Sequence, residues 1–99
     1  MLDTFSDATF APLLGQQFQL SPAPGQPIRL IVLITVEALG GPTQSGRQPF
    51  SLIFADATPG AALPQHIYSL THAVLGQLEL FLVPIGPVPG GMGYQAIFS

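Results

Sequence analysis

Hydrophobic and polar positions alternate in short stretches along most of the chain, and segments rich in Gly and Pro separate these stretches. Such alternation is typical of β-strands that bury one face. The pattern predicts strands at about 16–20, 28–39, 49–55, 66–72, 77–85 and 93–98. No helical segment lies between consecutive strands, so βαβ crossovers are excluded. We therefore expect an all-β fold, either a small antiparallel barrel or a sandwich of about six strands.

One helical segment is predicted before the first strand, at about 4–14. Phe10, Leu13 and Leu14 fall on one face of such a helix, and Ser6 or Asp7 can cap its start. Pro12 interrupts the segment and Gly15 is a natural stop. At 99 residues the chain forms one domain, 1–99, with a short N-terminal helix followed by the strands.

The strands at 66–72 and 77–85 are predicted to form a hairpin through a four-residue loop at 73–76. In this register His72 pairs with Gln77, and Tyr68 pairs with Phe81. Both faces of the hairpin then carry apolar side chains. We therefore expect it to be covered on two sides, by the helix or by another chain.

Charged residues make up 7% of the chain, against roughly 25% in an average soluble domain. There is no lysine, and the net charge is -3. Binding to nucleic acid or to anionic lipid needs clustered Lys and Arg, so both partner classes are excluded. No apolar run is long enough for a spanning helix, and the acidic start is unlike a secretory signal. We expect a chain that is cytoplasmic at synthesis.

Glutamine supplies much of the polar surface in place of charge. The nine glutamines are uncharged, so they give almost no like-charge repulsion between copies. Edge strands of β domains are commonly protected from pairing by Lys or by inward-pointing charges, which this chain lacks. The composition predicts edges that are covered by copies of the chain or by a partner.

His66 and His72 are the only imidazoles. They lie six residues apart on one predicted strand, so they share a face but stand roughly 20 Å apart and cannot share a metal ion. His72 can approach Glu79 diagonally across the hairpin, which gives a histidine–carboxylate pair of the kind that general bases use. A structural or surface role for both histidines is the alternative interpretation.

Tyr68 and Tyr94 combine apolar bulk with a hydroxyl group, which suits contact with a ligand or a partner. A core position whose hydroxyl reaches water is the alternative interpretation of these two residues, and the one we favour. The sequence contains no Gly-x-Ser-x-Gly elbow and no phosphate-binding loop that leads into a helix. We predict no catalytic residues, no metal ligands and no cofactor.

Several stretches together carry a family resemblance: 63–72, 75–86, 49–54 and 94–98, with Phe10 near the start. Their pattern, with LPQ, Tyr, His, LG, LFLVPIG and a final Tyr-Gln-Ala-Ile-Phe, resembles an uncharacterised family of small bacterial domains. The resemblance covers nearly the whole chain. It implies a compact β-rich fold and an association with phage-tail-like structural proteins.

Three functions are carried forward. The first is a non-enzymatic structural or protein-interaction module, buried in a homo-oligomer or in a larger, phage-tail-like assembly. The second is a small-ligand-binding β-barrel with an apolar pocket, in which His66, Tyr68 or Tyr94 fixes the polar end of the ligand. The third, an enzyme that uses His72 with Glu79, is the weakest because it rests on one pair of side chains.

Overall fold

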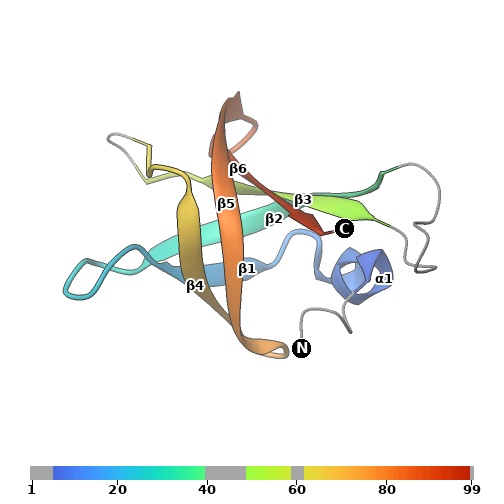
Figure 1. Cartoon of the computed structure of the whole chain (residues 1–99), viewed down its shortest axis with the longest axis horizontal. Helices are drawn as coiled ribbons and strands as arrows, with labels where there is room; N and C mark the ends of the chain where they lie inside the picture. The colour runs from blue at the N-terminus through green and yellow to red at the C-terminus, as the bar shows by residue number, and fades with distance from the viewer. Residues whose placement is uncertain (1–5, 40–48, 59–61, 99) are drawn as a thin grey trace.

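The strands form one closed antiparallel β-barrel with the order β1-β2-β3-β6-β5-β4 (Figure 1). The computed structural model describes residues 6–39, 49–58 and 62–98. The strands are β1 Gln17–Ser21, β2 Arg29–Ala38, β3 Phe50–Asp56, β4 His66–His72, β5 Gly76–Val88 and β6 Gly91–Phe98. The predicted all-β fold with about six strands and one short N-terminal helix is confirmed, and the barrel is the correct alternative.

The N-terminal helix is shorter than predicted. Helix α1 spans Asp7–Phe10, and a single 3-10 turn, η2, spans Ala11–Leu13. The predicted residues 4 and 5 lie outside the described part of the chain. Pro12 lies in the 3-10 turn, since proline lacks the N–H group that would continue an α-helix. Leu14 follows the turn and is exposed, so it does not share the buried face as predicted.

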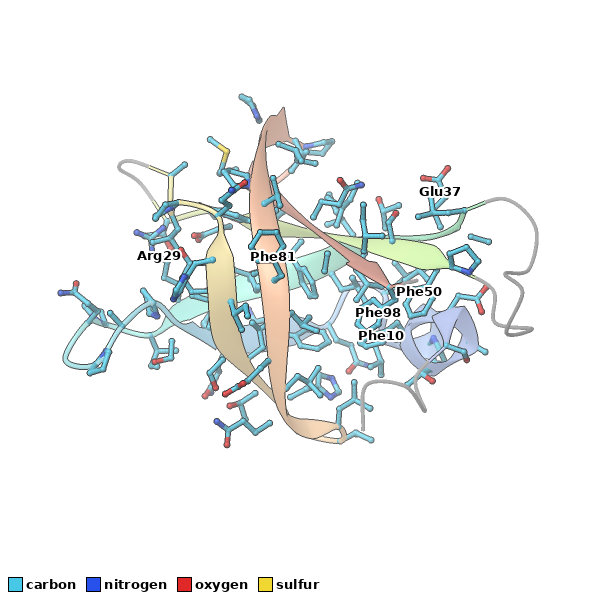
Figure 2. The ribbon with its side chains drawn as sticks, in the orientation of Figure 1. Phe10, Arg29, Glu37, Phe50, Phe81 and Phe98 are labelled. Atoms are coloured by element: carbon cyan, nitrogen blue, oxygen red, sulfur yellow. The ribbon has the colours of Figure 1, made fainter. Side chains whose placement is uncertain are left out.

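Phe10 closes one end of the barrel. Its ring lies 5.9 Å from the ring of Phe50 and 5.6 Å from the ring of Phe98, centre to centre. Phe50 and Phe98 are themselves stacked, at 4.5 Å. Figure 2 shows this cluster where α1 meets the ends of β3 and β6. The helix therefore acts as a plug that removes large aromatic surface from water.

Side chains fill the interior of the barrel. Alternate residues of each strand point inward, as the pleat of a β-strand requires. The largest inward side chains with no exposed surface are Phe18, Leu20, Ile31, Leu33, Leu52, Phe54, Leu70, Leu82 and Tyr94. The barrel is thus built around a packed core.

Strand β2 contains a β-bulge at Ile34. Leu33 pairs with Phe54 and Thr35 pairs with Ile53, so Ile34 is the extra residue. Before the bulge the odd positions Ile31 and Leu33 point inward, and after it an even position, Val36, packs against the core. Because the inward face changes phase in mid-strand, the sequence of β2 looks apolar on both faces.

Strand β5 changes partners in the middle. Gly76–Leu82 pairs with β4, and Val83–Val88 pairs with β6. The predicted end of this strand at residue 85 was too early, because Pro84 and Pro87 looked like breakers. From Val83 onward β5 pairs with β6 alone. A proline, which has no backbone N–H group to donate, is tolerated here because, among the described residues, the side of the strand that faces away from β6 has no partner strand to receive a hydrogen bond.

A two-residue turn, Pro89-Gly90, joins β5 to β6. Gly90 has a φ of 97° and Gly91 a φ of 139°, both in the region that favours glycine. A Cβ atom on Gly91 would overlap the backbone oxygen of Asp56. Strand β6 therefore begins at Gly91, two residues before the predicted position 93. At Gly91 the absence of a side chain lets the chain approach β3 closely.

The predicted register of the β4–β5 hairpin was wrong by one residue. His72 pairs with Gly76, and Tyr68 pairs with Leu80, so the loop has three residues. Gly76 has a φ of 78°, which allows this tighter loop. A shift of one residue turns every side chain of a strand to the opposite face. The leucines of β5 consequently point into the core together with Tyr68 and Leu70.

Candidate functional site

The five residues predicted as contact sites lie in three different places. His66 and Tyr68 lie together, with ring centres 5.4 Å apart. Tyr94 and Tyr68 are both hydrogen-bonded to the segment 63–64. His72 lies at the opposite end of β4 and is buried. Glu79 is exposed on the outer face of β5. The structure therefore joins His66, Tyr68 and Tyr94 in one region. Glu79 lines a second, open pocket together with His66, and His72 lies apart from the other four.

His72 has a structural role in the hairpin. Its Nδ1 atom accepts the backbone N–H of Val74 at 3.0 Å, so the proton of a neutral ring is on Nε2. Nε2 lies 2.7 Å from Oε1 of Gln16, to which it donates. The ring also packs on Phe18 at 4.6 Å. These contacts fix the loop after β4 and tie it to the start of β1.

The predicted pairing of His72 with Glu79 is wrong. Glu79 pairs with Ser69 and points outward, whereas His72 points into the barrel. The one-residue change in register accounts for the difference, because it places the two side chains on opposite faces of the sheet. The described residues hold no group of three or more His, Cys, Asp or Glu that could bind a metal ion.

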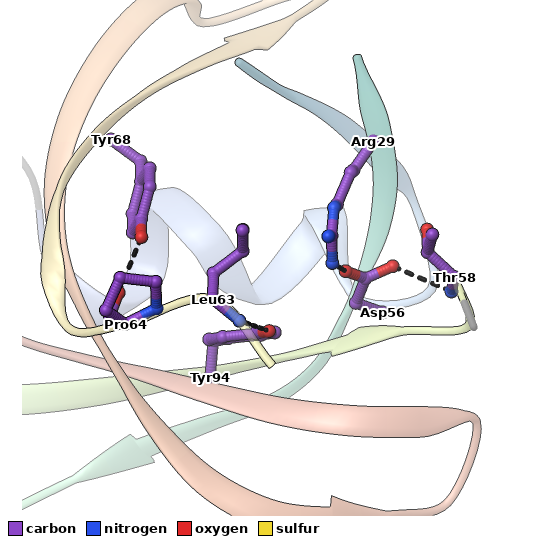
Figure 3. A network of polar contacts seen from close by, with 7 residues as sticks. All are labelled: Arg29, Asp56, Thr58, Leu63, Pro64, Tyr68 and Tyr94. Carbon is purple, nitrogen blue, oxygen red and sulfur yellow. Dashed lines mark hydrogen bonds and ion pairs between the residues drawn. The ribbon is translucent and has the colours of Figure 1, made fainter. Parts of the chain in front are cut away.

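Both tyrosine hydroxyls anchor one segment across the end of the barrel (Figure 3). The Tyr94 hydroxyl accepts the backbone N–H of Leu63 at 2.8 Å. The Tyr68 hydroxyl donates to the carbonyl oxygen of Pro64. Burial raises the pKa of Tyr68, with a smaller contribution from Tyr94, so its hydroxyl remains a donor at neutral pH. We call this end of the barrel, with Leu63 and Pro64 over it, the mouth.

A partly buried ion pair lies beside the mouth. Nη1 of Arg29 donates to Oδ2 of Asp56 at 2.9 Å, and Asp56 is only 1% exposed. The other carboxylate oxygen, Oδ1, accepts the backbone N–H of Thr58 at 2.9 Å. Burial acts to raise the pKa of Asp56, but the hydrogen bonds from Thr58 and the charge and hydrogen bond of Arg29 outweigh it. The pKa of Asp56 is therefore lowered.

Sequence reasoning missed this pair, because the predicted strand at 49–55 ends before Asp56. It is the last residue of β3, and its carboxylate points toward the start of β2. A carboxylate directly after an apolar strand, in a chain with two arginines, was the one available signal. The pairing itself depends on the β2–β3 register, in which Asp56 stands opposite Ile31.

An open pocket of about 720 Å³ lies at the mouth. Its polar groups are contributed by Gln26, Arg29, Thr58, His66 and Tyr68. Its apolar walls are made by Pro22, Ala23, Pro27, Ile28, Leu63 and Pro64. The pocket lies outside the packed core, so a small molecule would bind at the end of the barrel rather than within it.

A second feature is an apolar surface on the outside of the barrel. Ile67, Phe81 and Ile97 come from the three neighbouring strands β4, β5 and β6, and are 57%, 52% and 63% exposed. Ile67 stands directly opposite Phe81 in the β4–β5 ladder. All three line one groove of about 260 Å³, which Glu79 also borders. We call these three residues the outer apolar surface.

The groove follows a stretch where β5 and β6 are not paired. Their ladder begins at Val83 opposite Gln95, so Glu79–Phe81 and Ala96–Phe98 lie beyond it. In Figures 1 and 2 the two strands diverge over this stretch, with Phe81 on the exposed side of β5. Residues of a strand direct their N–H and C=O groups alternately to the two sides. Among the described residues, part of the backbone here therefore has no partner strand; we call this stretch the open seam.

These features define a small β-barrel domain with a pocket at one end and an exposed apolar surface on its side. The chain belongs to the family described as Domain of unknown function (DUF6916), which matches residues 5–98. This confirms the resemblance to an uncharacterised family. No curated protein and no solved structure matches the chain. Within the described ranges, no helix is long and apolar enough to cross a membrane.

Proposed function

We propose that this chain is a non-enzymatic protein-interaction module that self-associates through the outer apolar surface. The observation that carries this proposal is the position of Ile67, Phe81 and Ile97 on adjacent strands, each more than half exposed. Contiguous apolar patches on a soluble domain commonly mark interaction sites, and aromatic side chains are enriched at the centres of interfaces.

The open seam supports the same proposal. Unpaired strand edges can bind a strand of another chain by main-chain hydrogen bonds, and apolar side chains next to such an edge add burial. Of the described residues that line this groove, Glu79 alone is charged. Proteins that stay monomeric usually place more charge at an edge of this kind. Self-association would cover the seam and the outer apolar surface together.

The contacts of the polar candidates favour a module without catalysis. Gln16 and the loop backbone use both ring nitrogens of His72, and both tyrosine hydroxyls hold the segment over the mouth. Each of these groups has a bonding role that explains its presence. We keep a phage-tail-like assembly, which the family resemblance implied, as the proposed setting.

Sedimentation velocity over a range of micromolar concentrations tests this function. We expect the unmodified chain to associate, and Phe81→Ser to weaken the association at least about tenfold, since central aromatic residues dominate interface energies. Val74→Ser is the matched control, because Val74 is 79% exposed but lies in the β4–β5 loop. A chain that stays monomeric throughout, or equal effects of the two substitutions, would contradict the proposal.

A further inference from the structure

The pocket at the mouth has the size and composition of a small-molecule site. Its volume of about 720 Å³ lies within the range of roughly 300–1,000 Å³ that is usual for ligand pockets. Most of its wall is apolar, and the few polar groups come from β2, β4, the connection before β2 and the segment after β3. Ile28 contributes to the wall although it is 54% exposed to solvent, so a ligand would cover it.

Arg29 is the cation of this pocket. In Figure 3, Arg29 and Tyr68 lie on opposite sides of Leu63, with Tyr68 directed at Pro64 and Arg29 directed at Asp56. Asp56 uses only Nη1 of the guanidinium group. The described residues offer no hydrogen-bond partner to Nη2 or Nε, although Arg29 lines the pocket. The side chain is thus held in place by one carboxylate while donors remain for another acceptor.

These donors favour a carboxylate over other anions. A guanidinium group matches a planar carboxylate in geometry and charge, and such bonds are stronger than neutral ones. Asp56 already offsets much of the positive charge of Arg29. The negative charge of Asp56 would therefore repel a doubly charged phosphate more strongly than a singly charged carboxylate. The apolar walls call for a hydrocarbon body on the ligand, since burial of apolar surface supplies affinity.

We propose that the mouth pocket binds a small organic acid, with its carboxylate on Arg29 and its hydrocarbon chain against Ile28, Leu63 and the prolines. Thr58 and His66 lie at the same pocket as further polar contacts. This site is separate from the outer apolar surface, so it stands or falls independently of self-association.

Octanoate, 1-octanol and acetate are the probes, and titration followed by amide NMR shifts is the measurement. We expect saturable binding of octanoate, with shifts at Thr58, Leu63 and His66. Octanol, which has the same chain length without the charge, should bind about tenfold more weakly, as loss of a charge-assisted hydrogen bond implies. Acetate, which lacks the hydrocarbon body, should not saturate.

Two variants test the two halves of the site. The double substitution Arg29→Gln with Asp56→Asn replaces both charges with amides, and it should remove the preference for octanoate over octanol. Ile28→Ser leaves the ion pair in place and should weaken both probes equally. Because Ile28 is exposed, this variant is expected to fold even if the double variant does not.

Val74→Ser, in the β4–β5 loop, serves as the control and should bind octanoate like the unmodified chain. Three results would overturn the proposal. They are an absence of saturable octanoate binding, equal affinity for octanoate and octanol, and octanoate shifts that fall elsewhere than the mouth.

Discussion

Arg29 at the start of β2 and Asp56 at the end of β3 are joined by an ion pair of 2.9 Å. Three contacts converge on Asp56: the guanidinium group, the backbone N–H of Thr58, and the close approach of Gly91 to its carbonyl oxygen. One residue therefore links β2, β3, β6 and the segment that leads to the mouth.

Replacing Asp56 by Asn should lower the free energy of unfolding by about 1–3 kcal/mol, because a partly buried Arg29 loses its charged partner. Glu37→Gln makes the same chemical change at an exposed position of β2, and should stay within about 0.5 kcal/mol of the unmodified chain. Urea denaturation measures both variants. Equal effects at the two positions would show that the ion pair adds nothing to stability.

Stability should depend on pH through Asp56. The pKa of Asp56 is lower in the folded chain than its ordinary value of 3.8. Its contribution is therefore complete above that ordinary value and is lost as pH falls toward the folded pKa. The difference in unfolding free energy between the unmodified chain and Asp56→Asn should be constant near neutral pH and shrink below about pH 4. A difference that grows on acidification would contradict the assignment.

Gly91 and Gly25 should differ in their tolerance of alanine. Both have positive φ, but a Cβ on Gly91 overlaps the backbone of Asp56, whereas a Cβ on Gly25 meets open space. Gly25→Ala should cost about 1 kcal/mol, for the backbone conformation alone. Gly91→Ala should cost at least about 3 kcal/mol, since β6 must move away from β3. Thermal unfolding distinguishes the two, and comparable melting temperatures would show that the close approach is not required.

The hydroxyl of Tyr94 should hold the segment over the mouth. Tyr94→Phe leaves the N–H of Leu63 without its acceptor, and should cost about 1–2 kcal/mol. The Leu63 amide should then exchange with solvent faster, while the amide of Phe54 in β3 keeps its protection. Unchanged exchange at Leu63 would mean that other contacts hold this segment.

Most of the strands could be predicted because hydrophobic and polar residues alternate within segments that are bounded by Gly and Pro. Their antiparallel arrangement follows from the absence of helices between them. Strand β4 was predicted with its correct ends, since a period of two alone defines it. Strand β5 was predicted too short, because the tolerance of Pro84 and Pro87 depends on which neighbour the strand has at that point. That information comes from tertiary structure and is not local.

The candidate site shows the same limit. Tyr68 and Tyr94 were selected for their chemistry, and both proved to be core residues with bonded hydroxyls at the mouth. His72 and Glu79 failed as a pair because their proximity rested on a register that one residue of loop length decides. Arg29 and Asp56 are 27 residues apart in the chain, and no short-range pattern connects them.

The central claim, that the outer apolar surface is where copies of the chain meet, is tested most directly by amide NMR spectra recorded during dilution. We predict concentration-dependent shifts at Ile67, Phe81 and Ile97, with the amide of Val74 unchanged. Spectra that do not change with concentration, or shifts confined to other exposed apolar residues such as Leu30, would contradict it.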